Sequence, residues 1–288
     1  MGTEHPLARL IDEVDLLGTY WNKKHGLFKQ ASPTEGLIDE AAIQSMLDTG
    51  LLRWPYFTLL KEGQQPEISA FTKARNVSGQ AVKGFADPAR IRKHLASGAT
   101  MKMSQLEDWH LPIRSVMREI EERLPAELKA YIFYTPRDST GMLPHRDGSH
   151  VLAVQIAGAK EWRIYNSAEQ IDARSGLNVD VDSHSDSFVM EPGDVLYLPH
   201  GVPHVATARG GTSLHLTFTI TEPTPLDLVE SLMTLFSDAE GEWLDQGLGS
   251  ALQDEAAAVN KALLGFLDRV DTGLLVETAV ATMRDRTV

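Results

Sequence analysis

The sequence predicts a mixed α+β fold in which a double-stranded β-helix is flanked by N-terminal helices and strands and by a C-terminal helical region. Segments with the β-branched, aromatic or alternating composition of strands occur at 130–135, 151–165, 195–198 and 213–219. A turn-forming run, Glu191-Pro-Gly-Asp194, directly precedes the third of these segments. Apolar residues with helical spacing lie on both sides of this strand-rich region, which makes the class mixed.

Residues 1–130 are expected to form helices and strands that pack on the barrel. Apolar spacing predicts helices at 6–20, 37–47, 87–96 and 113–124, and alternation predicts strands at 51–60 and 99–103. Asp87 followed by Pro88 is typical of a helix start, and Gly98 is typical of a helix end. Pro55 cannot donate a ladder hydrogen bond, so its strand is expected at an edge or with a bulge.

Residues 131–222 are predicted to form the core of the β-helix. In the strand that leads into this core, alternation places Tyr131 and Phe133 on one face and Tyr134 on the other. Further along, two strand-forming runs at 151–156 and 161–165 are separated by Gly158, a pattern typical of a hairpin.

A candidate metal site lies in Pro144-His145-Arg146-Asp147 and in the more distant His204. Side chains two residues apart on an extended strand point the same way, so His145 and Asp147 can bind one ion, with His204 as a third ligand. Two neutral imidazoles and one carboxylate on one face of an ion leave the other positions open, which suits Fe(II). Because a His-x-Asp pair is common by chance, this prediction depends on the surrounding strand, turn and strand pattern.

Six blocks of the sequence together resemble the JmjC-type ribosomal oxygenases of the cupin superfamily. They lie at 135–136, 141–147, 155–165, 191–199, 203–204 and 213–217. The resemblance implies a cupin or JmjC jelly roll that depends on Fe(II), 2-oxoglutarate and O₂. Known members hydroxylate Arg or His side chains of ribosomal proteins. By this resemblance His145, Asp147 and His204 are the catalytic iron ligands.

Three further residues are candidates for binding the co-substrate. A lysine among Val, Ile and Trp needs a negative partner, and the family's basic residue at this spacing makes Lys160 the expected partner of the distal 2-oxoglutarate carboxylate. Composition alone favours a hairpin-tip Lys160 in water. Ser213 and Thr217 lie on the polar face of a strand expected to line the barrel, so they are weaker candidates. Tyr131 departs from the family, which commonly has Asn in its place.

Other histidines and acidic residues near the candidate site do not fit its spacing. The segment 167–187 is rich in Asp and also contains His184, so it can be interpreted either as a second metal site or as a solvated loop beside the substrate entrance, which is favoured. His150 is outside the motif. His200 is interpreted as a group behind the ligands or facing the substrate.

Composition excludes several classes of protein. With a net charge of −13, the chain is not expected to be a general nucleic-acid binder, whereas an acidic surface tolerates a basic partner. The absence of cysteine excludes disulfides, zinc fingers and thiol chemistry. No apolar run approaches the roughly 20 residues that cross a bilayer, and the N-terminus lacks a signal-peptide core. We therefore expect no membrane association and a cytoplasmic location.

Residues 223–288 are expected to be helical, with apolar stripes at 226–236, 243–252 and 256–270. The related oxygenases have a helical dimerisation region after the barrel and then a winged-helix module. The sequence has room for the helices but hardly for the whole winged helix. A homodimer formed through these helices is therefore a hypothesis, and the shortened C-terminus weakens the implication of a ribosomal substrate.

Three functions are consistent with these observations. The resemblance favours hydroxylation of a C–H bond in a side chain of a protein or peptide, with a substrate like a ribosomal protein. The same chemistry on a small metabolite or a peptide natural product is the second. The third is a non-enzymatic, metal-binding cupin, which iron- and 2-oxoglutarate-dependent formation of succinate would exclude.

Overall fold

The computed structural model describes residues 4–166, 176, 178–245 and 251–286. Contacts divide the chain into two compact units, the first made of 1–123 and 128–221 and the second of 124–127 and 222–288. The first unit holds the whole β-sheet, and the second holds the C-terminal helices. Within the described residues, no helix is both long and apolar enough to cross a membrane.

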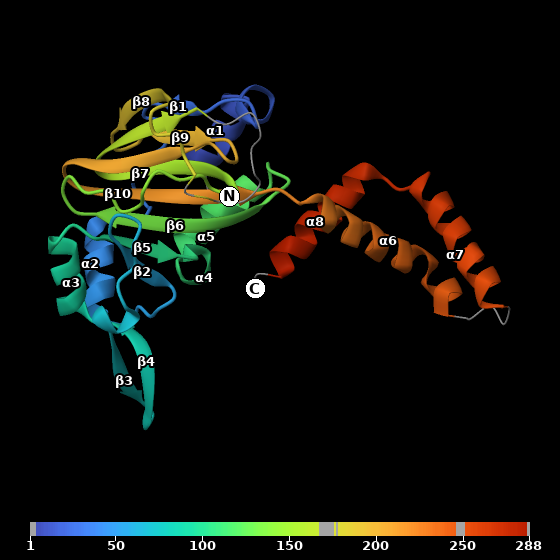
Figure 1. Cartoon of the computed structure of the whole chain (residues 1–288), viewed down its shortest axis with the longest axis horizontal. Helices are drawn as coiled ribbons and strands as arrows, with labels where there is room; N and C mark the ends of the chain where they lie inside the picture. The colour runs from blue at the N-terminus through green and yellow to red at the C-terminus, as the bar shows by residue number, and fades with distance from the viewer. Residues whose placement is uncertain (1–3, 167–175, 177, 246–250, 287–288) are drawn as a thin grey trace. The chain divides into compact units, whose positions relative to one another are not determined.

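The first unit is built on antiparallel strands, as Figure 1 shows. Their bounds are β1 Gly26–Phe28, β2 Phe57–Leu60, β3 Thr72–Val77, β4 Gln80–Ala86, β5 Thr100–Ser104, β6 Glu127–Thr135, β7 His150–Tyr165, β8 His184–Met190, β9 Val195–Leu198 and β10 His204–Thr221. Within the described residues, eight strands form one sheet in the order β1-β9-β7-β10-β6-β5-β2, with β8 on β7, while β3 and β4 pair separately. This large sheet among helices confirms the predicted mixed class and is consistent with the predicted jelly roll.

Strand β7 is continuous, so the predicted hairpin at Gly158 is wrong. One edge of β7 pairs with β10 along most of its length, while the other edge pairs with β9 over 151–154 and with β8 from Lys160 onward. Gly158 has a φ of +63°, and a Cβ there would lie 1.9 Å from the carbonyl oxygen of Thr212. The glycine therefore lies opposite an irregularity in β10, where residues 210–213 face this single residue of β7, because glycine adopts this φ without strain and has no Cβ to clash.

The turn before β9 is confirmed, and a buried carboxylate holds it. Asp194 donates its backbone N–H to the carbonyl of Glu191 at 3.0 Å. Its fully buried side chain accepts from the backbone N–H of Glu191 at 2.8 Å and of Gln30 at 3.0 Å, and from Lys29 Nζ at 2.6 Å. A buried charge is stable only when paired and hydrogen-bonded in this way. The N-terminal segment is thus tied to the strand that leads to His204.

Helices cover the first unit largely where apolar spacing predicts them. Their bounds are α1 Pro6–Glu13, α2 Glu40–Thr49, α3 Pro88–Ala96, α4 Leu106–Trp109 and α5 Leu111–Glu121, with a π-helical turn at Leu16–Tyr20 and a 3-10 turn at Ile68–Ala70. Asp87 caps α3 by accepting from the backbone N–H of Arg90, as its position before Pro88 predicts. The strand predicted at 51–60 is shorter than expected, because β2 begins only at Phe57, after Pro55.

The second unit contains the predicted C-terminal helices. They are α6 Pro225–Asp245, α7 Leu252–Leu267 and α8 Thr272–Asp285. Phe236 of α6 and Phe266 of α7 meet edge to face with ring centroids 5.5 Å apart, and both are buried. The apolar stripe predicted at 243–252 falls partly on 246–250, outside the described residues.

Candidate metal centre and co-substrate pocket

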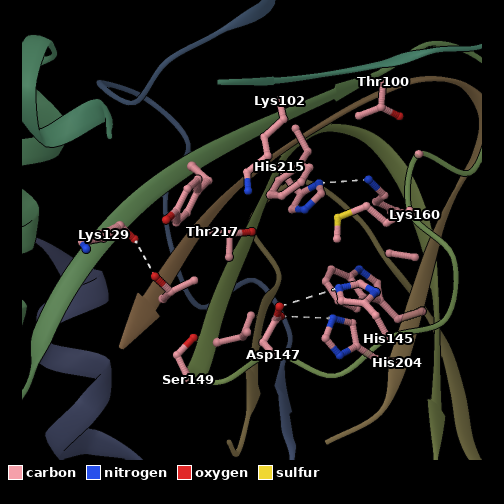
Figure 2. A pocket seen from close by; sticks show the side chains of 18 of the residues that line it. Thr100, Lys102, Lys129, His145, Asp147, Ser149, Lys160, His204, His215 and Thr217 are labelled. Atoms are coloured by element: carbon pink, nitrogen blue, oxygen red, sulfur yellow. Dashed lines mark hydrogen bonds and ion pairs between the residues drawn. The ribbon is translucent and has the colours of Figure 1, made fainter. Parts of the chain in front are cut away.

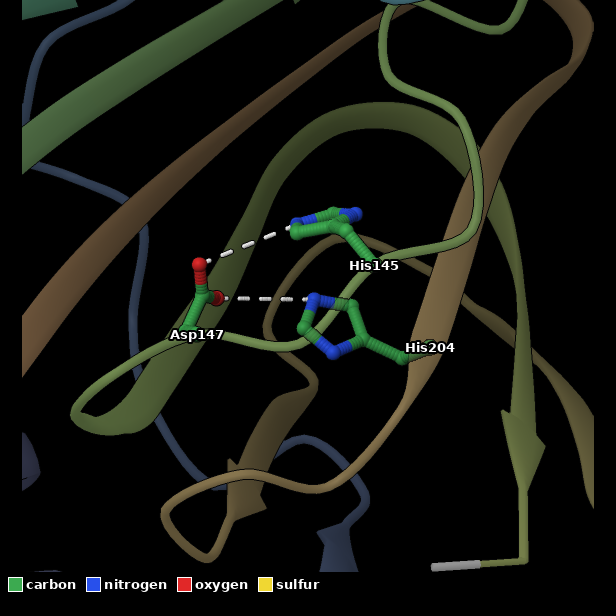
Figure 3. A group of neighbouring side chains, drawn as sticks. All are labelled: His145, Asp147 and His204. Atoms are coloured by element: carbon green, nitrogen blue, oxygen red, sulfur yellow. Dashed lines mark ion pairs between the residues drawn. The ribbon is translucent and has the colours of Figure 1, made fainter. Parts of the chain in front are cut away.

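The neighbouring side chains of His145 and Asp147 converge with that of His204, which is distant in sequence (Figure 3). Asp147 lies 3.8 Å from His145 through Oδ1 and Nε2, and 3.6 Å from His204 through Oδ2 and Nε2. In all, the three candidate ligand atoms lie within 4.8 Å of one another. Because two atoms 3.8 Å apart can each lie about 2.1 Å from a point between them, these residues fit a single transition-metal ion.

Hydrogen bonds orient both imidazoles for metal binding. His145 Nδ1 lies 2.8 Å from the carbonyl oxygen of Leu143, and His204 Nδ1 lies 3.0 Å from that of Val202. A carbonyl only accepts, so each Nδ1 carries the proton and each Nε2 presents its lone pair toward Asp147. This is the tautomer that a metal site requires, and it is fixed by the backbone.

Burial keeps His204 in the neutral form. Its side chain is almost wholly buried, and this burial, followed by the charge of His145, lowers its pKa to about 4, against the opposing effect of Asp147. A neutral imidazole is the form that binds a metal ion. The donor set of two imidazoles and one carboxylate therefore fits a divalent ion at neutral pH.

The first two residues of this triad lie in the connection between β6 and β7, not in a regular strand. His145 pairs with His204 in an isolated antiparallel bridge, with backbone N–H to carbonyl distances of 3.0 and 2.9 Å. The carbonyl of Asp147 accepts from the N–H of Gly201 at 3.1 Å. These bonds, rather than a continuous ladder, bring the three side chains together.

The triad borders a cavity of about 370 Å³ that the first unit encloses between β5, β6, β7 and β10. Figure 2 shows His145, Asp147 and His204 on one side of it, with Lys160 and His215 farther along the wall. Trp162, which is 3% exposed, stacks against His204 with ring centroids 5.6 Å apart. The lining combines aromatic side chains such as Phe133 and Trp162 with many charged and polar ones, so the cavity can bind a polar small molecule.

Lys160 points into the interior and not into water. It is 3% exposed, and its Nζ donates to His215 Nδ1 at 3.1 Å and to Thr135 Oγ1 at 3.4 Å. Burial lowers its pKa to about 7, and the described part of the protein supplies no carboxylate that raises it again. Because a buried cation requires a counter-charge, the wall of the cavity presents a binding point for an anion.

Thr217 and Ser213 occupy different positions. Thr217 lines the cavity, and its buried hydroxyl has no hydrogen-bond partner among the described residues. Ser213 is fully buried but does not line the cavity, and its hydroxyl accepts from Gln155 Nε2 at 2.9 Å. Strict alternation along the strand would place Ser213 and Thr217 on the same face. The ladder between β7 and β10 shifts register on both sides of Leu214, however, so the two side chains have different surroundings.

Tyr131 and Phe133 line the cavity, as strand alternation predicts. Lys102 and His215 line the cavity but are absent from the sequence-based candidates. Lys102 lies on β5, which carries no recognisable motif. His215 stacks on Phe133 with centroids 4.8 Å apart, and burial, followed by the charges of Lys160 and His204, holds its pKa well below the usual range. The sequence did contain a signal for His215, because alternation places it on the polar face of the strand at 213–219.

The remaining candidates lie outside the cavity lining. His150 is buried, stacks on Trp21 with centroids 3.9 Å apart, and bonds Tyr197 Oη through Nδ1 at 2.9 Å. His200 does not line the cavity either, and its backbone N–H donates to His150 Nδ1 at 3.3 Å. Both therefore belong to the packing beneath the site.

The acidic segment 167–187 is only partly a loop. Its end forms strand β8, because His184 begins the ladder with β7, while residues 167–175 and 177 lie outside the described residues. Asp186 pairs with His25 at 3.0 Å. Of the groups that could hold a metal among the described residues, the triad is the one found, so the second site is not supported.

Residues 102–228 match the JmjC domain family. The protein named bifunctional lysine-specific demethylase and histidyl-hydroxylase NO66 of Drosophila erecta is 30% identical over 161 residues, which are 53% of this chain and 24% of that protein. Ribosomal oxygenase 1 of Homo sapiens is 25% identical over 236 residues, 77% of this chain and 35% of that protein. The chain spans less than half the length of these curated relatives.

Solved structures share the fold. That of ycfD from E. coli has a TM-score of 0.59 and 18% identity, covering 90% of this chain and 68% of the other. The Escherichia coli ribosomal oxygenase YcfD in complex with cobalt and 2-oxoglutarate has a TM-score of 0.53 and 17% identity, covering 90% and 67%. Residues 102–228 of this chain are therefore a JmjC domain, homologous to those of the NO66 proteins and of ribosomal oxygenase 1.

Proposed function

We propose that this chain is an Fe(II)- and 2-oxoglutarate-dependent oxygenase that hydroxylates a C–H bond of an amino-acid side chain in a protein or peptide. The observation that carries the proposal is the convergence of His145, Asp147 and His204 beside a buried lysine without a counter-charge. The JmjC domain supports it, as do the names of its relatives and the cobalt and 2-oxoglutarate bound by the E. coli protein of the same fold.

Each residue of the site has a part that follows from its position. His145, Asp147 and His204 would hold the ion on one face and leave the rest of its coordination sphere to ligands. Lys160 would bind the distal carboxylate of 2-oxoglutarate by a charge-assisted hydrogen bond, and the hydroxyl of Thr217 would gain a partner. Trp162 keeps water from one side of His204.

When bound, Fe(II) would couple the decarboxylation of 2-oxoglutarate by O₂ to hydroxylation, so that substrate C–H, 2-oxoglutarate and O₂ give the alcohol, succinate and CO₂. The protein supplies the orientation of the ion and of the co-substrate. His215 takes part indirectly, because its neutral Nδ1 accepts from Lys160 and so fixes the direction of the ammonium group.

The test is formation of succinate by the purified protein with Fe(II), 2-oxoglutarate and O₂. We expect His145→Ala and Asp147→Ala each to lower it by at least about 100-fold, more than the 10- to 100-fold typical of residues behind metal ligands. His184→Ala, an exposed histidine on β8, is the matched control and should retain turnover. Equal turnover in wild type and ligand variants would exclude the proposal, and proteins that gain an oxygen atom in cells would identify the substrate.

A further inference from the structure

A second lysine, Lys102, enters the cavity from β5. In the ladder between β5 and β6 it lies opposite Phe133, and its Nζ lies 4.3 Å from the ring centroid of Tyr131 and 5.6 Å from that of Phe133. Figure 2 shows its side chain extending from the strand into the cavity, apart from Lys160. The two ammonium groups therefore border the same space from different strands.

The ammonium group of Lys102 has no directly bonded partner of opposite charge among the described residues. It makes no ion pair or hydrogen bond within the described residues, and its polar contacts are the two ring faces. Burial lowers its pKa, against the effect of the Asp147 charge. Cation–π contact attracts an ammonium group but leaves its N–H donors unsatisfied. A partly buried ammonium in this state is a binding point for an acceptor, best an anion.

Charge counting assigns that acceptor to the substrate, given the proposed function. A divalent ion, the Asp147 carboxylate, the 2-oxoglutarate dianion and the Lys160 ammonium together sum to zero charge. Lys129 also lines the cavity, but its charge acts on Glu107, where it opposes the rise in pKa that burial causes. Lys102 therefore remains as the unmatched charge of the filled site.

We propose that Lys102 is a specificity-determining residue that selects substrates presenting a carboxylate to the metal centre, such as an Asp or Glu side chain or the terminal carboxylate of a polypeptide. A basic group would place a second cation beside the Lys102 ammonium, and like charges held close together repel each other. Such a substrate would differ in charge from the lysine side chains to which the names of the NO66 relatives refer. This inference rests on the proposed function.

The experiment uses the full-length protein loaded with Mn(II) and saturated with 2-oxoglutarate. Two probes, N-acetyl-aspartate methylamide and N-acetyl-arginine methylamide, are titrated separately, and broadening of their proton NMR lines by Mn(II) reports occupancy of the cavity. We expect at least about fivefold more broadening of the aspartate probe. Lys102→Met should abolish this preference, Lys102→Arg should keep it and Lys102→Glu should reverse it.

Controls separate this inference from the proposed function. Lys129→Met should keep the preference, and an equal loss in Lys129→Met and Lys102→Met would overturn the assignment. Equal broadening of both probes by wild type, or none of either, would also overturn it. Two further outcomes would place Lys102 at the co-substrate and so overturn the assignment. One is displacement of the aspartate probe by excess 2-oxoglutarate. The other is a loss of 2-oxoglutarate affinity in Lys102→Met as large as in Lys160→Met. Failure of wild type to bind 2-oxoglutarate would instead reject the proposed function.

Discussion

The two lysines that border the cavity differ in their contacts, and this gives them different roles. Lys160 is held by two hydrogen bonds, to His215 and Thr135, so its ammonium has a fixed direction suited to one invariant co-substrate. Lys102 lies over aromatic faces, which attract a cation without fixing its direction. A less constrained group suits substrates of varied shape.

Replacing Lys160 tests its role directly. We expect Lys160→Met to weaken binding of 2-oxoglutarate to the Mn(II)-loaded protein by about 10- to 100-fold, because a charge-assisted hydrogen bond contributes about 1.5–3 kcal/mol. Isothermal titration at pH 7 measures the dissociation constant. Lys129→Met is the control and should bind as wild type does. Unchanged affinity in Lys160→Met would show that the distal carboxylate is bound elsewhere.

The lowered pKa of Lys160 also predicts how stability depends on pH. Since its pKa is about 7 in the folded protein and 10.5 in the unfolded state, the unfolded state binds more protons between these values. Stability of the metal-free protein therefore rises with pH in this window, relative to Lys160→Met, by up to about 1.4 kcal/mol per pH unit. Urea unfolding of both proteins at pH 7, 8 and 9 measures the difference. A constant difference would mean that Lys160 stays protonated.

At the scale of single residues, the sequence predicts those parts of the site that a short spacing encodes. His145 and Asp147 are adjacent in a motif, and His204 follows a recognisable turn. Lys102 could not be predicted, because a lysine in an alternating strand is usually at the surface and only the pairing of β5 with β6 turns it inward. The roles of His145, Asp147 and His204 as metal ligands remain predictions.

At the scale of elements, β7 and β10 carry the site. Both are long, they pair with each other, and they supply Lys160, Trp162, His204, His215 and Thr217. The strands themselves were predictable from composition. The continuity of β7 through Gly158 was not, because a glycine between two strand-forming runs has the same local signal whether the backbone reverses or continues, and only the pairing partner decides.

The bulge predicts a large effect for a small substitution. Gly158→Ala would adopt an unfavourable φ and place its Cβ 1.9 Å from the Thr212 carbonyl oxygen, so we expect a loss of about 2–5 kcal/mol in unfolding free energy. Weaker 2-oxoglutarate binding should accompany it, because Lys160 follows two residues later. Thermal unfolding measures the first effect and titration the second.

Gly265→Ala in α7 is the control for that substitution. A Cβ there meets no atom within 4 Å, and alanine favours a helix over glycine by about 0.5–1 kcal/mol. It should leave stability unchanged or slightly raised. Similar stability of Gly158→Ala and wild type would contradict the close approach of this residue to the carbonyl of Thr212.

At the scale of the whole molecule, charge is distributed unevenly. The protein has a net charge of −13, yet its cavity is lined by three lysines, Lys102, Lys129 and Lys160, and by a single carboxylate, Asp147. A cationic cavity attracts small anions locally even when the net charge of the protein is negative. Net charge alone could not predict this, because it does not say which residues face inward.

The second unit leaves apolar side chains in water, and this supports the hypothesis of a homodimer. Leu226, Val229 and Met233 repeat at helical spacing on α6 and are 65%, 54% and 44% exposed. Leu252, Leu264 and Leu274 on α7 and α8 are also exposed. A stripe of this kind is typical of a helix that packs against another surface.

We therefore expect the full-length protein to have the mass of a dimer in light scattering at micromolar concentration. Val229→Asp combined with Met233→Asp should shift it to the monomer, because burying two unpaired carboxylates would cost more than an apolar contact of this size contributes. Leu111→Asp removes an equally exposed apolar residue from α5 in the first unit and should leave the mass unchanged. A monomer mass for wild type would reject the dimer, whereas a dimer in all three proteins would place its interface away from α6.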